Sequence, residues 1–91
     1  MLLSKLEGQK GILRILTFIR DRGETNFQKI IDETDLYDRI VRNSLPILKE
    51  LNLIETRIDK TSYPYKNMIS LTEKGKKVAE KLKEIEVILL E

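Results

Sequence analysis

Four segments of this chain carry apolar residues at the three-to-four residue spacing of a helix, and this recurring period constrains the fold more than any other feature. The pattern covers about residues 9–21, 26–33 and 36–51, and it returns over about residues 73–90. In the third segment the expected buried stripe consists of Val41, Leu45, Leu48 and Leu51. We therefore expect three helices in succession and a fourth at the C-terminus.

Residues that favour helix ends lie at the expected boundaries. Gly23 follows the first helical segment, and Thr25 with Gln28 has the spacing of a capping box in which Thr25 is the N-cap. Asn52 follows the third segment and tolerates the left-handed conformation that often ends a helix. Thr72 precedes the last segment and can cap it.

Between the third and fourth helical segments, the chain has the composition of two strands. Residues 53–58 and 68–71 are rich in β-branched and apolar side chains. They flank a long, mostly polar stretch, about residues 59–67, that contains Pro64. A β-hairpin with a long loop is expected here, so the fold class is mainly α with a small β-hairpin.

Two phrases of the sequence resemble those of one group of DNA-binding proteins. One is the helix that carries Leu36, Val41, Leu45 and Leu48 and closes on Leu51 to Glu55; the other is Ile69 to Gly75, Ile-Ser-Leu-Thr-Glu-Lys-Gly. The first is similar to the recognition helix and first wing strand of MarR, PadR and ArsR-like transcriptional regulators. The second is similar to the segment in which those proteins pass from the second wing strand to the next helix. The resemblance covers roughly residues 10–80.

This resemblance implies a winged helix-turn-helix domain with a three-helix core, a two-stranded wing and a C-terminal dimerisation helix. The core with its wing would cover residues 1–72, and the dimerisation helix of the same single domain would cover residues 73–91.

The chain departs from the family pattern at two positions. Pro46 falls inside the expected recognition helix, where it removes a backbone donor and clashes with the carbonyl group four residues earlier. We expect a kink or break near Asn43 and Ser44, and Ser44 could be the N-cap of a shorter helix. Asn52 stands where these families usually have glycine, and asparagine is the next best residue for that geometry.

The resemblance implies that the N-terminal half of the third helical segment faces the major groove of DNA. Its outward residues would be Tyr37, Arg39, Arg42 and Asn43. Arg can donate two hydrogen bonds to guanine and Asn can bond adenine at two points, so these residue types suit direct readout. Asp38 is the weakest member, because phosphates repel a carboxylate, and it could instead cap the helix. The alternative is a solvated helix face that contacts only water.

The wing offers three cations for contacts with phosphates or the minor groove: Arg57, Lys60 and Lys66. Tyr63 and Tyr65 flank Pro64, and they could either pack against the sugar-phosphate surface or stiffen the loop and cover the hairpin. Weaker candidates for phosphate contacts, on the first two helices, are Lys10, Arg14 and Lys29.

The last helical segment has more apolar surface than a small core can cover. Its expected interface residues are Val78, Leu82, Ile85, Ile88 and Leu89, and the surface is widened by Val87 and Leu90. The N-terminal residues Met1, Leu2, Leu3 and Leu6 add to the excess. Because large apolar patches usually mark interfaces, we expect a homodimer joined through this helix, with the N-terminal segment packed against it. The alternative is a helix that folds back only on its own domain.

Composition argues against most enzyme classes. The sequence has no cysteine and no histidine, which removes thiol nucleophiles, the commonest zinc ligands and the usual general base. We expect no enzyme activity, no metal and no cofactor. An acidic cluster could bind a hard cation in principle, but we expect it to be solvated or to balance the nearby Arg39 and Arg42: Asp32, Glu33, Asp35 and Asp38. No apolar run approaches the roughly 20 residues that span a bilayer, and the N-terminus lacks the pattern of a signal peptide. A cytoplasmic protein with no membrane partner is expected.

The charge balance leaves three interpretations of the role. Lys and Arg number 17 against 15 Asp and Glu, and a net charge of +2 does not by itself indicate nucleic-acid binding. The leading prediction is a homodimeric, sequence-specific transcriptional regulator that binds double-stranded DNA at a pseudo-palindromic site. The alternatives are a winged-helix protein-interaction module and a weakly selective architectural DNA-binding protein. A domain of this size leaves little room for a dedicated ligand pocket.

Overall fold

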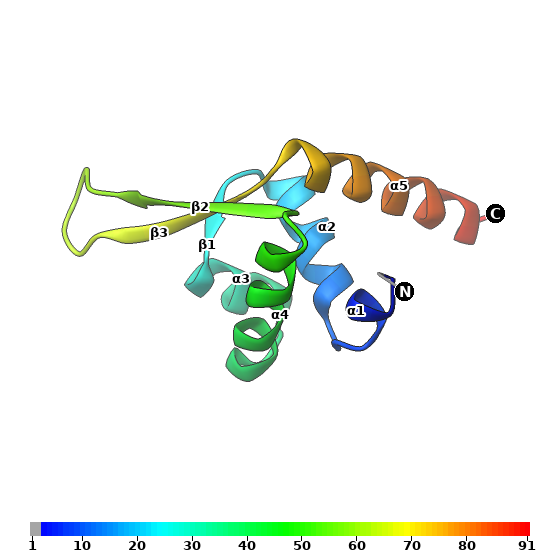
Figure 1. Ribbon diagram of the computed structural model, residues 1–91, viewed down its shortest axis with the longest axis horizontal. Coiled ribbons are helices and arrows are strands. Elements are labelled where there is room, and N and C mark those ends of the chain that lie inside the picture. The colour runs from blue at the N-terminus through cyan, green and yellow to red at the C-terminus, as the bar shows by residue number, and fades with distance from the viewer. Residues whose placement is uncertain (1–2) are drawn as a thin grey trace.

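The computed structural model describes residues 3–91, and its wing and its last helix extend towards opposite ends of the molecule (Figure 1). The helices are α1 (Leu3–Glu7), α2 (Ile12–Arg22), α3 (Phe27–Thr34), α4 (Asp38–Glu50) and α5 (Glu73–Leu89). The strands are β1 (Thr25–Asn26), β2 (Ile54–Asp59) and β3 (Lys66–Leu71). This order is that of a winged helix-turn-helix domain, and the expected fold class is confirmed. Met1 and Leu2, expected in an N-terminal apolar segment, lie outside the described residues.

The core is built around α2. The buried side chains of this helix follow the predicted helical period: Ile12, Ile15, Leu16 and Ile19. They belong to one apolar cluster with Ile30 of α3, Val41 and Leu48 of α4, Ile69 and Leu71 of β3, and Ala79 of α5. Because α2 contacts α3, α4, β3 and α5, its burial sets the positions of these elements relative to one another.

The structure has a short helix, α1, before the first helix expected from the sequence. We expected one helix from about residue 9, but α2 begins at Ile12 and the short α1 precedes it. Gly11 separates the two helices, because its left-handed φ of 81° departs from helical geometry. A Cβ atom on Gly11 would lie 2.9 Å from Ile40 Cγ2, so this turn also packs closely against α4.

A third strand, β1, extends the sheet beyond the two-stranded wing expected from the sequence. It pairs with β3 in an antiparallel sheet of order β1-β3-β2, with Thr25 opposite Ile69. Thr25 is therefore a buried strand residue, and the prediction that it caps the next helix was wrong. The N-cap is Asn26, whose side chain accepts a hydrogen bond of 3.0 Å from the Lys29 backbone N–H. The β-branched Thr25 suits a pleated sheet, and Asn suits the cap position.

α4 continues through Pro46, so the break expected from that residue does not occur. Pro46 has no amide N–H, so the Arg42 carbonyl group loses its donor within the helix. Because Pro46 is exposed, this carbonyl group lies on the solvent side, where water can donate to it. Ser44 is buried, and its hydroxyl donates to the Ile40 carbonyl oxygen at 2.7 Å, a contact inside the helix rather than at an N-cap. The helix begins later than expected, at Asp38.

One polar corner joins the end of α4, the base of β2 and the start of α5. The Thr72 hydroxyl donates to the Asn52 carbonyl oxygen at 2.6 Å and accepts from the Gly75 N–H at 2.9 Å, so Thr72 caps α5 as predicted. Asn52 has the left-handed conformation that its position predicted, with φ of 61°. A Cβ atom on Gly75 would lie 1.9 Å from the Leu53 carbonyl oxygen. The corner therefore requires glycine at this position.

We predict that Gly75→Ala destabilises the domain. Alanine is normally favoured over glycine in a helix by about 1 kcal/mol, but here its methyl group would collide with the Leu53 backbone. The expected net loss in the free energy of unfolding is about 2 kcal/mol, measured by urea denaturation followed by circular dichroism. Lys77→Ala, on the exposed side of α5, is the control, and equal stability of the two variants would contradict the close approach.

Candidate nucleic-acid interface

The N-terminal half of α4 presents the four side chains selected from the sequence, at the end of the helix that lies away from α5 (Figure 1). Tyr37 occupies the N-cap position and is 79% exposed. Arg39, Arg42 and Asn43 are exposed on the following turns. Among residues 3–91, no group bonds the side-chain polar atoms of Arg39 and Asn43. These two side chains can therefore meet an external ligand without first breaking a contact.

Arg42 differs from its neighbours because two residues hold its guanidinium. Its Nε lies 2.7 Å from Asp38 Oδ1, and its Nη2 donates to Asp38 Oδ2 at 3.1 Å. Its guanidinium carbon lies 5.6 Å from the centre of the Phe27 ring, at the start of α3, in a cation–π arrangement. The sequence ranked Asp38 as the weakest member of the set, and the interpretation in which its carboxylate balances a nearby arginine is confirmed for Arg42. The Asp-to-Arg spacing of four residues was the available signal.

The three basic side chains expected on the wing differ in their surroundings. Lys60 is exposed in the loop between β2 and β3, and Lys66 is exposed at the start of β3. Arg57 is bound instead by Glu24, which precedes β1: its Nε and Nη2 donate to the two carboxylate oxygens at 2.8 and 2.6 Å. The pair ties β2 to the segment before β1. No local pattern could have revealed it, because 33 positions separate the two residues.

The tip of the wing carries two exposed aromatic rings. The ring centres of Tyr63 and Tyr65 are 5.9 Å apart and their planes meet at 73°, which makes an edge-to-face pair. Tyr63 is 90% exposed. The rings therefore support each other and remain open to solvent, which is compatible with both roles considered from the sequence.

A pocket of about 490 Å³ lies between the start of α3 and the start of β3. It brings together Lys29 and Lys66, which the sequence presented as separate candidates. The remaining lining residues are Asn26, Phe27, Gln28, Asp32 and Asn67. The N-terminus of α3 adds partial positive charge to this region. The sequence did not indicate that polar side chains gather around the two lysines, because they come from two distant stretches, residues 26–32 and 66–67.

Several charged residues named from the sequence contact other parts of the protein. Arg14 Nη1 donates to a backbone carbonyl oxygen at the end of α3 at 3.4 Å. In the acidic cluster, Glu33 pairs with Arg22 at 2.6 Å. Gln28, expected to reach back to the helix start, donates instead to Asp32 at 2.9 Å. Within residues 3–91, no three histidine, cysteine or acidic side chains form a group that could hold a metal ion.

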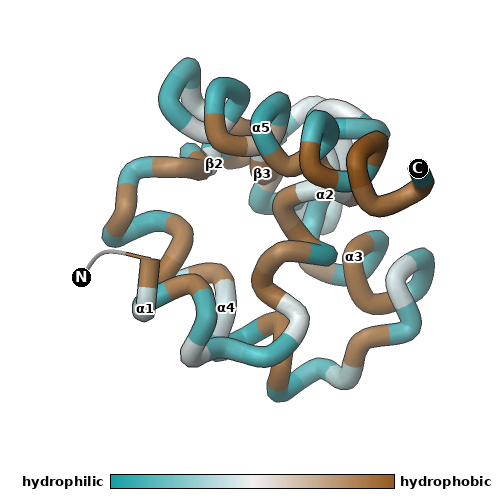
Figure 2. Tube along the Cα trace, turned by 90° about the vertical axis from the view of Figure 1, so that its right-hand side faces the viewer, coloured by the Kyte–Doolittle hydropathy of each residue, from teal (hydrophilic) through white to brown (hydrophobic). Residues whose placement is uncertain are grey.

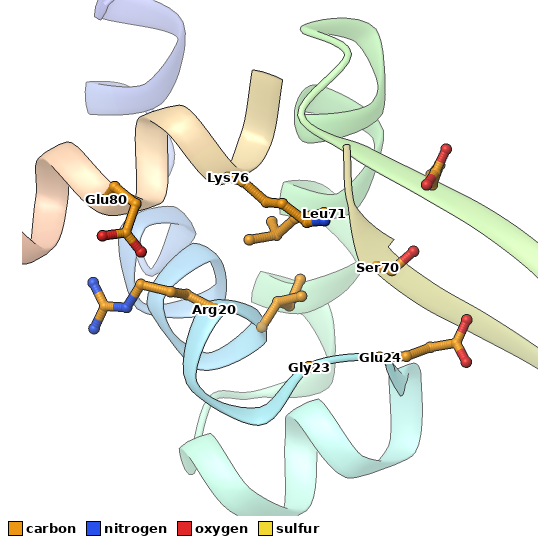
Figure 3. Close-up of a pocket in the computed structure, with 9 residues that line it drawn as sticks. Arg20, Gly23, Glu24, Ser70, Leu71, Lys76 and Glu80 are labelled. Carbon is orange, nitrogen blue, oxygen red and sulfur yellow. The ribbon is translucent and has the colours of Figure 1, made fainter. Parts of the chain in front are cut away.

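A second hollow, of about 660 Å³, lies between α2, the first half of α5 and the sheet (Figure 3). Its apolar part includes Ile19 and Leu71, and charges of both signs line it: Arg20, Glu24, Glu55, Lys76 and Glu80. The Arg20 side chain is only 12% exposed, and its Nη1 donates to the Ala79 carbonyl oxygen at 3.2 Å. This hollow is larger than the sequence led us to expect. Beside it, the hydrogen bond from Arg20 joins α2 to α5.

The expected dimer-interface residues divide into two groups along α5. Val78 and Leu82 are half-buried and pack against the core of their own domain, the alternative left open from the sequence. The second group is exposed, and Figure 2 shows it as a brown stretch near the C-terminal end: Ile85, Val87, Ile88, Leu89 and Leu90. No helix among residues 3–91 is both long enough and apolar enough to cross a lipid bilayer.

Comparison with solved structures identifies the fold. The reduced form of the transcriptional regulator YodB from B. subtilis has a TM-score of 0.78 and 22% identity, and the match covers 93% of this chain and 81% of that chain. An apo-form mutant of Lactococcus lactis ZitR has a TM-score of 0.78 and 21% identity, covering 97% of this chain and 66% of its own. A transcriptional regulator homologue from Pyrococcus horikoshii OT3 has a TM-score of 0.70 and 18% identity, with 94% of each chain covered.

No family model and no curated protein matches the sequence. The chain has the winged-helix fold of these solved regulators, and the resemblance seen in the sequence is confirmed at the level of the fold.

We predict that the contact between the wing and the segment before β1 is sensitive to acid. The hydrogen bonds from Arg57 hold the pKa of the Glu24 carboxyl below its ordinary value, although burial opposes them. Because the folded-state pKa is lowered, the contact stabilises the protein above the unfolded-state pKa, and this contribution is lost as pH falls through the folded-state pKa. Glu24→Gln should therefore lower stability near neutral pH, and its difference from the wild type should shrink below about pH 4.

The measurement is the urea midpoint of each protein in a pH series from about 7 down to about 3. Glu55→Gln is the control, since it removes an exposed carboxylate of β2 that has no ion-pair partner among residues 3–91. A difference between Glu24→Gln and the wild type that stays constant over the series would contradict the assigned contact.

Proposed function

We propose that this protein binds double-stranded DNA as a sequence-selective transcriptional regulator, with α4 in the major groove and the wing on the backbone or in the minor groove. The fold that it shares with solved transcriptional regulators supports this role. The observation that carries the proposal is the exposed face of α4, where Arg39 and Asn43 have no protein partner among residues 3–91. The proposed role is binding, with no catalytic step.

The arrangement of side chains on α4 suits base readout. Arg39 and Asn43 are four positions apart, about one helical turn, so they lie on the same side of the helix. Arg can bond guanine at two points and Asn can bond adenine at two points, while the Tyr37 hydroxyl can donate to a phosphate or a base. Pro46 is exposed further along and offers no polar group, so we place the readout in the first half of α4.

Lysine side chains near α4 would contact the phosphates. Lys29 and Lys66 line one pocket beside the start of α3, and Lys60 lies on the loop of the wing. Each phosphate contact adds about one unit to the slope of log affinity against log salt concentration. Arg57 is already bound to Glu24, so Lys60 and Lys66 are the stronger candidates on the wing.

We further propose that a second copy of the chain covers the exposed end of α5. Ile88 is 61% exposed and Leu89 is 77% exposed, and two basic side chains followed by two acidic ones lie on the preceding turns: Lys81, Lys83, Glu84 and Glu86. A two-fold axis would pair each apolar residue with the same surface on the other copy and place opposite charges together. Two copies of α4 would then contact half-sites about one DNA turn apart, in a pseudo-palindromic sequence.

This dimer refines the division made from the sequence between a core, residues 1–72, and a dimerisation helix, residues 73–91. The first half of α5 packs on the core through Val78 and Leu82, and only the second half is open to a partner.

We predict that the protein binds duplex DNA with a steep salt dependence and enriches a two-fold-symmetric sequence from a random pool. Arg39→Ala should weaken binding to the enriched site by about 10- to 100-fold, because a two-point contact with a base is lost. Its binding to random duplex should change much less. Fluorescence anisotropy over a salt series measures both affinities, and Lys77→Ala on α5 is the control for loss of one positive charge.

Each alternative role has its own result in this experiment. Salt-dependent binding without enrichment of any sequence would support an architectural DNA-binding protein. Absence of binding even at low salt would contradict the DNA-binding proposal and favour a protein-interaction module.

We predict that the isolated protein is a dimer at micromolar concentration and that Ile88→Glu makes it monomeric. The side chain is exposed, so a charge there should leave the monomer folded but be costly against the apolar surface of a second copy. Analytical ultracentrifugation measures the oligomeric state. Ile58→Glu on the wing is the matched control, because Ile58 is 58% exposed and lies outside the proposed interface. A monomeric wild type, or a dimeric Ile88→Glu, would overturn the dimer.

A further inference from the structure

Asp38 occupies one edge of the Arg42 guanidinium, the guanidinium carbon lies over the Phe27 ring, and the outer edge is open. We propose that Asp38 and Phe27 are positioning residues that set the base preference of the domain, because they hold Arg42 in an orientation that selects guanine. This inference rests on the DNA-binding function proposed above and names the group that gives that function its selectivity.

The hydrogen-bond donors of Arg42 show which edge is open. A guanidinium has five N–H donors; Nη2 donates one to Asp38 Oδ2 at 3.1 Å, and Nε forms an ion-pair contact of 2.7 Å with Asp38 Oδ1. The donors that remain are those of Nη1 and the second N–H of Nη2, and no group among residues 3–91 accepts from them. One N–H of Nη1 and the second N–H of Nη2 lie parallel on the outer edge. This is the pattern that matches the N7 and O6 acceptors of guanine in the major groove.

Phe27 gives the Arg42 guanidinium a second contact, over its aromatic ring. The ring is half-buried and packs against the apolar core, so it is an anchored surface for the guanidinium carbon 5.6 Å from its centre. An arginine side chain has several rotatable bonds, and the entropic cost of bonding a base is lower when the side chain is already ordered. Arg39, on the same helix, has no such support among residues 3–91.

Asp38 also changes how Arg42 interacts with phosphates. Its carboxylate offsets the charge of Arg42 and repels the DNA backbone, so Arg42 adds little to sequence-independent attraction. Removing the negative charge should therefore have two opposite effects: weaker discrimination at guanine and stronger binding to random duplex. A role for Asp38 in stability alone would weaken binding to every sequence.

The test compares the wild type with Asp38→Asn on the sequence that the wild type enriches. Each guanine of that site is replaced in turn by 7-deazaguanine, which lacks the N7 acceptor but keeps its base pairing. One replacement should weaken wild-type binding about tenfold, and Arg42→Ala should identify that position by losing the effect. Asp38→Asn should respond to the same replacement by about twofold or less, and its affinity for random duplex should rise.

Two further variants separate orientation from charge and folding. Asp35→Asn removes the same charge from an exposed residue with no partner among residues 3–91, and asparagine tolerates its left-handed φ of 59°. This control should keep the tenfold response. Phe27→Leu keeps the apolar bulk without the aromatic ring, and this variant should lose part of the tenfold response. Circular dichroism checks that each variant is folded.

The outcomes distinguish this inference from the function on which it rests. If the wild type binds no DNA or enriches no sequence, the proposed function fails. If the wild type enriches a sequence but a folded Asp38→Asn keeps the full response to 7-deazaguanine, or binds random duplex more weakly, the positioning role is overturned and the proposed function stands.

Discussion

The close approach of α5 to the base of the wing is the contact that places the wing and the last helix relative to the core around α2. A Cβ atom on Gly75 would lie 1.9 Å from the Leu53 carbonyl oxygen, so the first turn of α5 rests directly on the backbone where α4 passes into β2. Thr72 reinforces the corner through its hydrogen bonds to Asn52 and Gly75. The end of α4, the wing and the start of α5 therefore act as one unit. In the proposed dimer, a tilt at this corner would change the distance between the two copies of α4.

Arg20 attaches α5 to the core a second time, further along the helix. Its Nη1 donates to the Ala79 carbonyl oxygen at 3.2 Å and to Glu86 at 3.4 Å, and its Nε lies 2.8 Å from Asp21 Oδ1. The hydrogen bond to Asp21 is the main reason why the pKa of Arg20 is raised, against the effect of burial. Beyond this attachment the apolar side chains of α5 are exposed. The same helix thus begins as part of the core and ends as a free surface.

Features that depend on one helical turn were predictable from the sequence, and features that depend on distant segments were not. The cap at Thr72 and the outward face of α4 follow from local chemistry and helical period, and both were expected. The strand at Thr25 is too short to show a pattern, and its place in the sheet comes from β3. Pro46 is tolerated because its side of α4 is exposed, which is a tertiary property. The contact of Arg42 with Phe27 on α3 and that of Arg57 with Glu24 before β1 likewise join distant segments, so the sequence alone could not predict them.

Acidic residues beside the proposed interface would allow a nearly neutral domain to bind DNA selectively. A strongly basic surface binds any sequence tightly, because each neutralised phosphate releases counterions. Here Glu24 offsets the charge of Arg57 and Asp38 offsets that of Arg42, so in the proposed complex sequence-independent attraction would fall mainly to the lysines. A regulator finds its site among many competing sequences through the ratio of specific to random affinity rather than through affinity alone. Balanced charge raises that ratio by weakening random binding, provided that the arginines of α4 keep an edge open to the bases.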